Sequence, residues 1–114
     1  MRKGDIYYAD MGTVVGSEQG GTRPVVIIQN DVGNRHSPTV IVAVATTRTN
    51  KHPLPTHYWL EQTEHNRLPK NSMVMLEQIK TLDKKRLIDY CGHISKRDMI
   101  EIDKAIKISL GIKE

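Results

Sequence analysis

A glycine-rich polar segment, residues 16–22, leads into Arg23, and Arg23 directly precedes an apolar run over 24–29. Thr46 ends the next apolar run, 39–46. If these runs pair as antiparallel strands, the end of one lies beside the start of the other, so Thr46 comes close to Arg23. A guanidinium with hydroxyl and backbone N–H donors can bind a phosphate or stabilise a pentacoordinate phosphorane. We therefore expect a phosphate-binding or phosphodiester-cleaving site that needs no metal.

Other catalytic chemistries find little support. No carboxylates have the pairing of a glycosidase, and the glycines of 16–21 lack the Lys-Ser/Thr that completes a P-loop. The histidines do not have the spacing of metal ligands; they stand at 36, 52, 57, 65 and 93. The alternative interpretation is that Gly20 and Gly21 only form a hairpin loop and that Arg23 is a surface ion-pair partner.

The single cysteine, Cys91, lies in a strand-like stretch, so a buried thiol is expected. His93 would share its strand face, but no third group orients the two for nucleophilic catalysis. One cysteine cannot form an internal disulfide, and no apolar signal segment follows the first residues. The expected location is the reducing cytoplasm.

Composition adds a bias toward a nucleic-acid partner. Lys and Arg number 17 against 13 Asp and Glu, which gives a net charge of +4, and a basic domain is compatible with nucleic-acid binding. The longest unbroken apolar run, 40–45, is far shorter than the ~18 residues of a membrane helix, so no membrane span is expected. The 114 residues, 1–114, are expected to form one domain.

Short strands separated by turn residues must position these side chains. Strands are predicted over 5–9, 24–29, 39–46, 56–61, 72–77 and 86–91, with a short helical turn at 81–85. The runs 24–29 and 39–46 are apolar on both faces and should be central. After Ser95, apolar residues recur at helical spacing up to Gly111, which predicts a C-terminal helix that packs on the sheet. The fold class is therefore α+β and mostly β, as a small barrel or a strongly bent sheet.

The motif Gly16-Ser-Glu-Gln-Gly-Gly-Thr-Arg-Pro24 resembles that of the MazF/PemK family of toxin endoribonucleases (mRNA interferases), in the form found in Gram-positive bacteria. Further stretches match in order along the chain, at 2–10, 25–31, 54–57, 76–81 and the closing Leu110-Gly111. The resemblance thus covers essentially the whole chain.

The resemblance implies an SH3-like β-barrel with a C-terminal helix, assembled as a homodimer. It further implies metal-independent cleavage of single-stranded RNA at short sequences, leaving 2′,3′-cyclic phosphate and 5′-hydroxyl ends. No cofactor is expected. The expected partners are single-stranded RNA and a MazE-like antitoxin, with DNA contacted only through the antitoxin and no membrane partner.

The family's catalytic residues carry over to Arg23 and Thr46, and Glu18 matches an acidic position of some members. By the same resemblance, the expected RNA contacts are Ser17, Gln19, Gly20, Gly21, Asn30, Asn34, Leu54, Pro55, Thr56, His57, Glu77 and Gln78. In transesterification Arg23 suits the charge that develops on the phosphorane, since it is always cationic and can bind in a bidentate manner. Thr46 would position the scissile phosphate or the 2′-hydroxyl.

The sequence leaves two candidates for the general base, Glu18 and His57, although a structural or base-stacking role is favoured for His57.

Two other functions compete with the ribonuclease. One is a non-catalytic toxin of the same fold class that binds a protein such as DNA gyrase, and the Arg-Pro and glycine-rich pattern argues against it. The other is a small basic RNA-binding module without catalysis.

Overall fold

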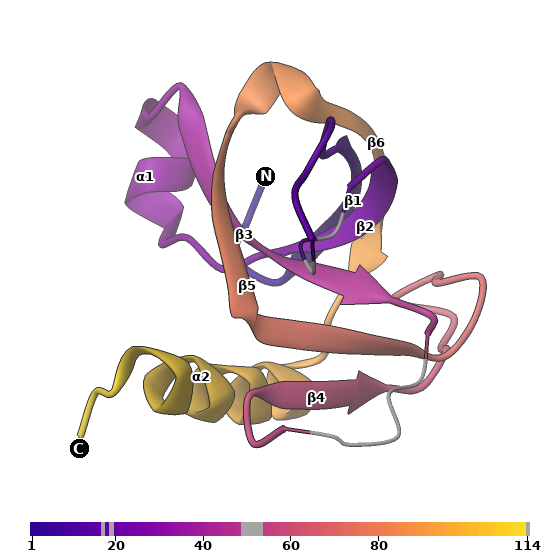
Figure 1. Cartoon of the computed structure of the whole chain (residues 1–114), viewed down its shortest axis with the longest axis vertical. Coiled ribbons are helices and arrows are strands. Elements are labelled where there is room, and N and C mark those ends of the chain that lie inside the picture. Colours follow the sequence, from indigo (N-terminus) through magenta and orange to yellow (C-terminus); the bar gives the residue numbers. More distant parts are fainter. Residues whose placement is uncertain (17, 19, 49–53, 114) are drawn as a thin grey trace.

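Six antiparallel strands form one strongly bent sheet in the order β4-β5-β3-β2-β1-β6 (Figure 1). The computed structural model describes residues 1–16, 18, 20–48 and 54–113. The elements are β1 (Asp5–Asp10), β2 (Thr22–Ile27), α1 (Asp31–His36), β3 (Thr39–Thr46), β4 (His57–Leu60), β5 (Ser72–Asp83), the 3-10 turn η1 (Lys84–Arg86), β6 (Leu87–His93) and α2 (Lys96–Leu110). All six predicted strands are present, and the predicted antiparallel pairing of β2 with β3 is confirmed.

Two apolar cores lie on opposite faces of the central strands. Val26 and Ala43 belong to one core, which α2 covers, whereas their neighbours Val25, Val42 and Val44 belong to the other. Side chains of a strand alternate between faces, so a central strand that contributes to both cores must be apolar throughout. The prediction that β2 and β3 are central strands covered on both faces is confirmed.

Strand β5 is longer than predicted and contains a large bulge. Ala43 of β3 pairs with Ile79, but the next residue, Val44, pairs with Met75, so the register with β3 shifts by three residues across 76–78. Figure 1 shows the ribbon of β5 turning sharply along its length. Bulges bend a strand and redirect its side chains, and this one lies where two of the predicted RNA contacts stand, Glu77 and Gln78.

No ladder joins the edge strands β4 and β6 in the described part of the chain, so the sheet is not closed by hydrogen bonds between strands. Instead the segment after β4 packs on β6, where the His93 N–H donates to the carbonyl of His65 at 3.0 Å. The backbone approach is close: a Cβ on Gly92 would lie 2.4 Å from the carbonyl oxygen of Asn66. Glycine at this position lets the two edges meet.

Helix α2 has the predicted capped ends. The Ser95 hydroxyl accepts from the Asp98 N–H at 3.1 Å, and Gly111 ends the helix in the left-handed conformation at φ 70°. The hydroxyl of Tyr58 donates to Asp98 at 2.6 Å, which joins β4 to the first turn of the helix. Burial and this bond raise the pKa of Tyr58 to about 12, so the phenol remains a proton donor at neutral pH. Among the described residues, no helix has both the length and the apolar character needed to cross a membrane.

Candidate active site and its family

Arg23 and Thr46 lie on neighbouring strands at one end of the sheet. Val25 pairs with Val44, and the same register carried outward places Arg23 opposite Thr46. Strand alternation directs both side chains to one face. On the other side of β2, Arg23 pairs with Ala9, whose small side chain is fully buried.

The loop between β1 and β2 orients the guanidinium of Arg23. Its Nε donates to the carbonyl of Gly20 at 3.0 Å, while the remaining N–H donors of the group are carried by Nη1 and Nη2. Gly20 packs tightly, because a Cβ there would lie 2.9 Å from the carbonyl oxygen of Gly12. Gly21 has φ +74°, a conformation that favours glycine. These two glycines, predicted as RNA contacts, therefore also have a folding role in shaping the loop that holds Arg23.

Thr46 is 4% exposed at the end of β3. Its Oγ1 accepts a hydrogen bond from the backbone N–H of Arg48 at 3.2 Å. A hydroxyl that accepts in this way still carries one proton to donate. Thr46 therefore offers a positioned donor rather than a strong base.

The Glu18 carboxylate, in the same loop as Gly20, is held at both of its oxygens. Oε1 accepts from the Val15 N–H at 3.0 Å, and Oε2 lies 3.7 Å from Nζ of Lys80. The hydrogen bond from Val15, followed by the charge of Lys80, lowers the pKa of Glu18 below its ordinary value. A general base works best with a pKa near the working pH, so Glu18 is better suited to remain ionised than to take a proton.

Thr56, His57 and Glu77 form a connected network. His57 Nδ1 accepts from the Leu54 N–H at 3.1 Å, and Nε2 lies 2.7 Å from Oε2 of Glu77. The Thr56 hydroxyl donates to the other oxygen of Glu77 at 3.1 Å. With Nδ1 accepting, Nε2 must be the nitrogen that donates to the carboxylate. Both ring nitrogens are thus engaged, as in a structural histidine, and His57 has no nitrogen left to act as the base.

A small pocket of about 320 Å³ brings part of the predicted site together. It is lined by Glu18, Glu77, Gln78, Ile79 and Lys80, and we call it the bulge pocket. Two of these residues, Ile79 and Lys80, were not predicted, although both lie in the stretch 76–81 that resembles the family. No group of three His, Cys, Asp or Glu placed to hold a metal ion occurs among the described residues.

Asn30 and Asn34 are not brought to Arg23, because they lie beyond the opposite end of β2. Residues 31–36, for which the sequence predicted no helix, form α1. The side chain of Asn30 caps this helix by accepting from the Gly33 N–H at 2.8 Å. Asn34 is 4% exposed and donates to the carbonyl of Gln29 at 2.9 Å. Within one chain, both amides organise α1.

Of the other predicted RNA contacts, Leu54 and Pro55 are exposed just before β4. Ser17 and Gln19 lie outside the described residues.

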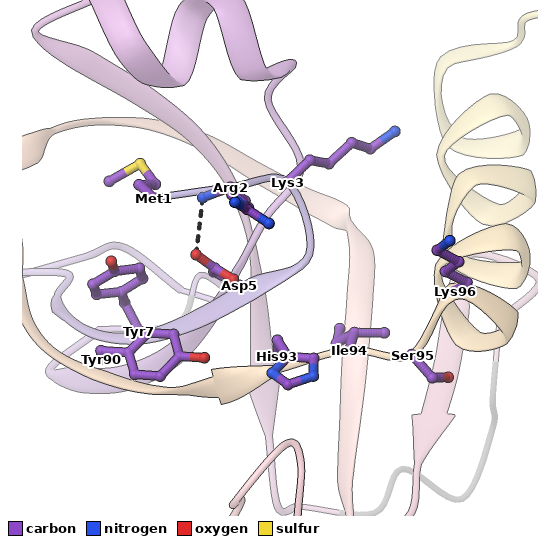
Figure 2. A pocket seen from close by; sticks show the side chains of 10 residues that line it. All are labelled: Met1, Arg2, Lys3, Asp5, Tyr7, Tyr90, His93, Ile94, Ser95 and Lys96. Carbon is purple, nitrogen blue, oxygen red and sulfur yellow. Dashed lines mark hydrogen bonds between the residues drawn. The ribbon is translucent and has the colours of Figure 1, made fainter.

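A second concavity, of about 740 Å³, is separate from the bulge pocket (Figure 2). Figure 2 shows Tyr7 and Tyr90 on one side of it, in an edge contact with ring centroids 5.5 Å apart, and Asp5 accepting from the backbone N–H of Arg2. It shares no lining residue with the bulge pocket.

Comparison with protein families identifies the family of this chain. Residues 2–110 match the model of the PemK-like, MazF-like toxins of type II toxin–antitoxin systems. The chain belongs to this family. The match covers nearly all of the toxin, including both strands that carry Arg23 and Thr46.

Curated relatives and solved structures agree with this membership. The toxin is 55% identical to the endoribonuclease MazF of Staphylococcus saprophyticus and to that of Staphylococcus epidermidis, over 98% of its own length and 92% of theirs. It also resembles a mycobacterial endoribonuclease solved in complex with its cognate antitoxin, with a TM-score of 0.81 and 27% identity over 100% of this chain and 98% of the other. MazF from Deinococcus radiodurans has the same fold, with a TM-score of 0.81 at 19% identity over 97% and 96% of the two chains. The predicted family and fold class are confirmed.

Proposed function

We propose that the toxin cuts single-stranded RNA by attack of a 2′-hydroxyl on the adjacent phosphate, leaving 2′,3′-cyclic phosphate and 5′-hydroxyl ends without a metal ion. The toxin is an endoribonuclease of a type II toxin–antitoxin system, as its family and its relatives at 55% identity establish. The observation that supports the finer proposal is the β2–β3 register, which extended by two residues sets Arg23 opposite Thr46, together with the hydrogen bond from the guanidinium to Gly20.

The proposed chemistry assigns one task to each group. As the 2′-oxygen bonds to phosphorus and gives its proton to solvent water, negative charge develops on the phosphorane oxygens, and the Arg23 guanidinium stabilises that charge. The bond between phosphorus and the 5′-oxygen then breaks, and that oxygen leaves with a proton from solvent water. The Thr46 hydroxyl donates to the phosphate or orients the attacking 2′-hydroxyl. Glu18, ionised at neutral pH, acts through its charge rather than by accepting the proton.

Sequencing of both new RNA ends after incubation with pure protein tests this proposal. We expect cuts at a short sequence that leave 5′-hydroxyl and cyclic phosphate ends, at an unchanged rate in EDTA. A strict need for a divalent metal, or 5′-phosphate ends, would contradict the proposed chemistry. Salt-sensitive binding without new ends would indicate a binding module, and inhibition of gyrase supercoiling without RNA cleavage would indicate the non-catalytic alternative.

We further propose a MazE-like antitoxin as partner, in the cytoplasm. The family is defined by toxin–antitoxin pairs, and the mycobacterial and Deinococcus structures include complexes with an antitoxin. A reducing compartment fits the single free cysteine, Cys91, which is buried. Contact with DNA would be only indirect, through the antitoxin.

A homodimer completes the proposal, and an apolar groove beside the C-terminal half of α2 is the surface we assign to it. The groove, about 460 Å³, has mostly apolar lining: Ile28, Ile41, Ile79, Ile106, Leu110 and Ile112, with Lys3, Asp103 and Lys107. Lys3 and Asp103 form an ion pair of 2.9 Å there. An apolar centre with charged residues at its rim is the usual composition of a protein interface.

Leu110→Glu is expected to raise the dissociation constant of this dimer by about 10²-fold, because the interface would bury an unpaired charge. Sedimentation at micromolar concentration measures the change. Ile88→Glu on β6 is the matched control, since Ile88 is 54% exposed and Leu110 is 59% exposed. Equal effects of both variants, or no effect of either, would place the dimer contact elsewhere.

A further inference from the structure

Lys80 reaches the candidate site from β5, which is distant in sequence from the motif at residues 16–24. It follows the bulge of β5 and pairs with Val42 of β3. Its side chain is 24% exposed and reaches across to Glu18, with 3.7 Å between Nζ and Oε2. Lys80 thus lines the bulge pocket together with Glu18 and two predicted RNA contacts, Glu77 and Gln78.

Two cations hold the same short piece of the β1–β2 loop. Arg23, on β2, binds the carbonyl of Gly20, and Lys80, on β5, faces the carboxylate of Glu18 two residues earlier. The two contacts differ in kind. The Arg23 contact is a hydrogen bond of ordinary length, whereas the Lys80–Glu18 pair is long and partly exposed, and such pairs are weak and screened by solvent.

A weak, partly exposed ion pair beside a phosphodiester-cleaving site is readily exchanged for a stronger one. A lysine ammonium binds phosphate as a point charge with three donors. The carboxylate of Glu18 would keep its hydrogen bond from the Val15 N–H when Lys80 turned to another anion, so the loop would retain part of its anchoring.

We propose that Lys80 binds a phosphodiester group of the RNA and that Glu18 is its counterion in the RNA-free protein, displaced when RNA binds. The inference rests on the proposed ribonuclease function and adds a second phosphate-binding cation to it. In this proposal the Glu18 carboxylate competes with the RNA phosphate for Lys80, and the phosphate must displace it.

The test uses an RNA that contains the cut sequence with a 2′-deoxynucleotide at the cut, so that binding is measured without cleavage. Lys80→Gln is expected to raise Kd by about tenfold near 0.15 M salt and to reduce the slope of log K against log salt by about 0.7, the value for one phosphate contact on a single strand. Lys80→Arg should restore the affinity to within about threefold of wild type, since the charge returns.

Lys85→Gln is the matched control. It removes the same charge from an exposed position in η1, outside the bulge pocket. We expect less than a twofold change in Kd, because long-range attraction is largely screened at this salt concentration. A Lys80→Gln protein that binds like Lys85→Gln would overturn the inference.

RNA binding by Glu18→Gln distinguishes two roles of Lys80: binding a phosphate of the RNA, or only holding the β1–β2 loop in place through its ion pair with Glu18. Loss of a competitor predicts unchanged or tighter RNA binding by Glu18→Gln, whereas loss of a tether predicts the same weakening as in Lys80→Gln. Equal weakening would therefore also overturn the inference. Failure of the proposed function is recognised separately, because the wild-type protein would then not cut RNA at all.

Discussion

Replacement of Arg23 with alanine is expected to reduce the rate of RNA cleavage by about 10²–10³-fold, the loss typical for removal of one donor to a charge that develops in the transition state. The guanidinium is oriented by its bond to Gly20, and the β2–β3 register extended by two residues sets Arg23 opposite Thr46. Because the lost contact is strongest in the transition state, the effect should appear in kcat more than in KM. Single-turnover cleavage of a labelled RNA measures it.

The matched control is Arg97→Ala, which removes an exposed arginine in the first turn of α2. It should leave the rate within about twofold of wild type. Arg23→Lys should recover only part of the activity, since a lysine cannot make a bidentate contact. Thr46→Ala should also lower the rate, with recovery in Thr46→Ser. A folded Arg23→Ala protein that cuts at nearly the wild-type rate would remove Arg23 from the mechanism.

Gly92→Ala is expected to lower the free energy of unfolding by about 1–3 kcal/mol or more, through overpacking. The added Cβ would lie 2.4 Å from the carbonyl oxygen of Asn66 and 2.5 Å from that of His65. Both atoms belong to the backbone, so no side-chain rotation relieves the contact, and β6 must move away from the segment that covers its edge. Urea unfolding followed by circular dichroism measures the change.

Gly33→Ala is the matched control for Gly92→Ala. Its added Cβ would meet the side chain of Gln29, at 3.0–3.1 Å, instead of a backbone. The side chain can shift, and alanine favours the helix by up to about 1 kcal/mol over glycine. We expect a change of less than about 1 kcal/mol in either direction. If Gly92→Ala were as stable as wild type, the close approach at β6 would have no energetic importance.

Local patterns predicted most of the fold. The strands show apolar runs bounded by turn residues, and α2 shows helical spacing between Ser95 and Gly111; such signals depend on neighbours in the chain. Helix α1 was missed because its residues, which include Gly33, have weak helix propensity. Distant contacts support it instead: Asp31 accepts from the Lys3 N–H at 2.7 Å, and Lys84 Nζ donates to the carbonyl of Asn34 at 2.6 Å.

The candidate site, like the fold, has one part that follows from local sequence and another part that depends on contacts between distant residues. The proximity of Arg23 and Thr46 follows from antiparallel pairing of two consecutive strands, which sequence alone can suggest. The approach of Lys80 to Glu18 depends on the bend of β5, and that bend becomes visible only when the pairing with β3 is known. The network around Glu77 likewise joins residues that lie 20 and 21 positions apart.

The bulge of β5 also bears on how this toxin can diverge. Residues 73–75 and 79–83 each keep their own register with β3, and the three residues between them form the bulge at which the register shifts. A one-residue insertion or deletion there would leave both ladders aligned, whereas elsewhere in a strand it would turn every following side chain to the other face. The lining of the bulge pocket can therefore change in length as well as in residue type while both cores persist. Relatives with different RNA preferences could arise at this position without a new fold.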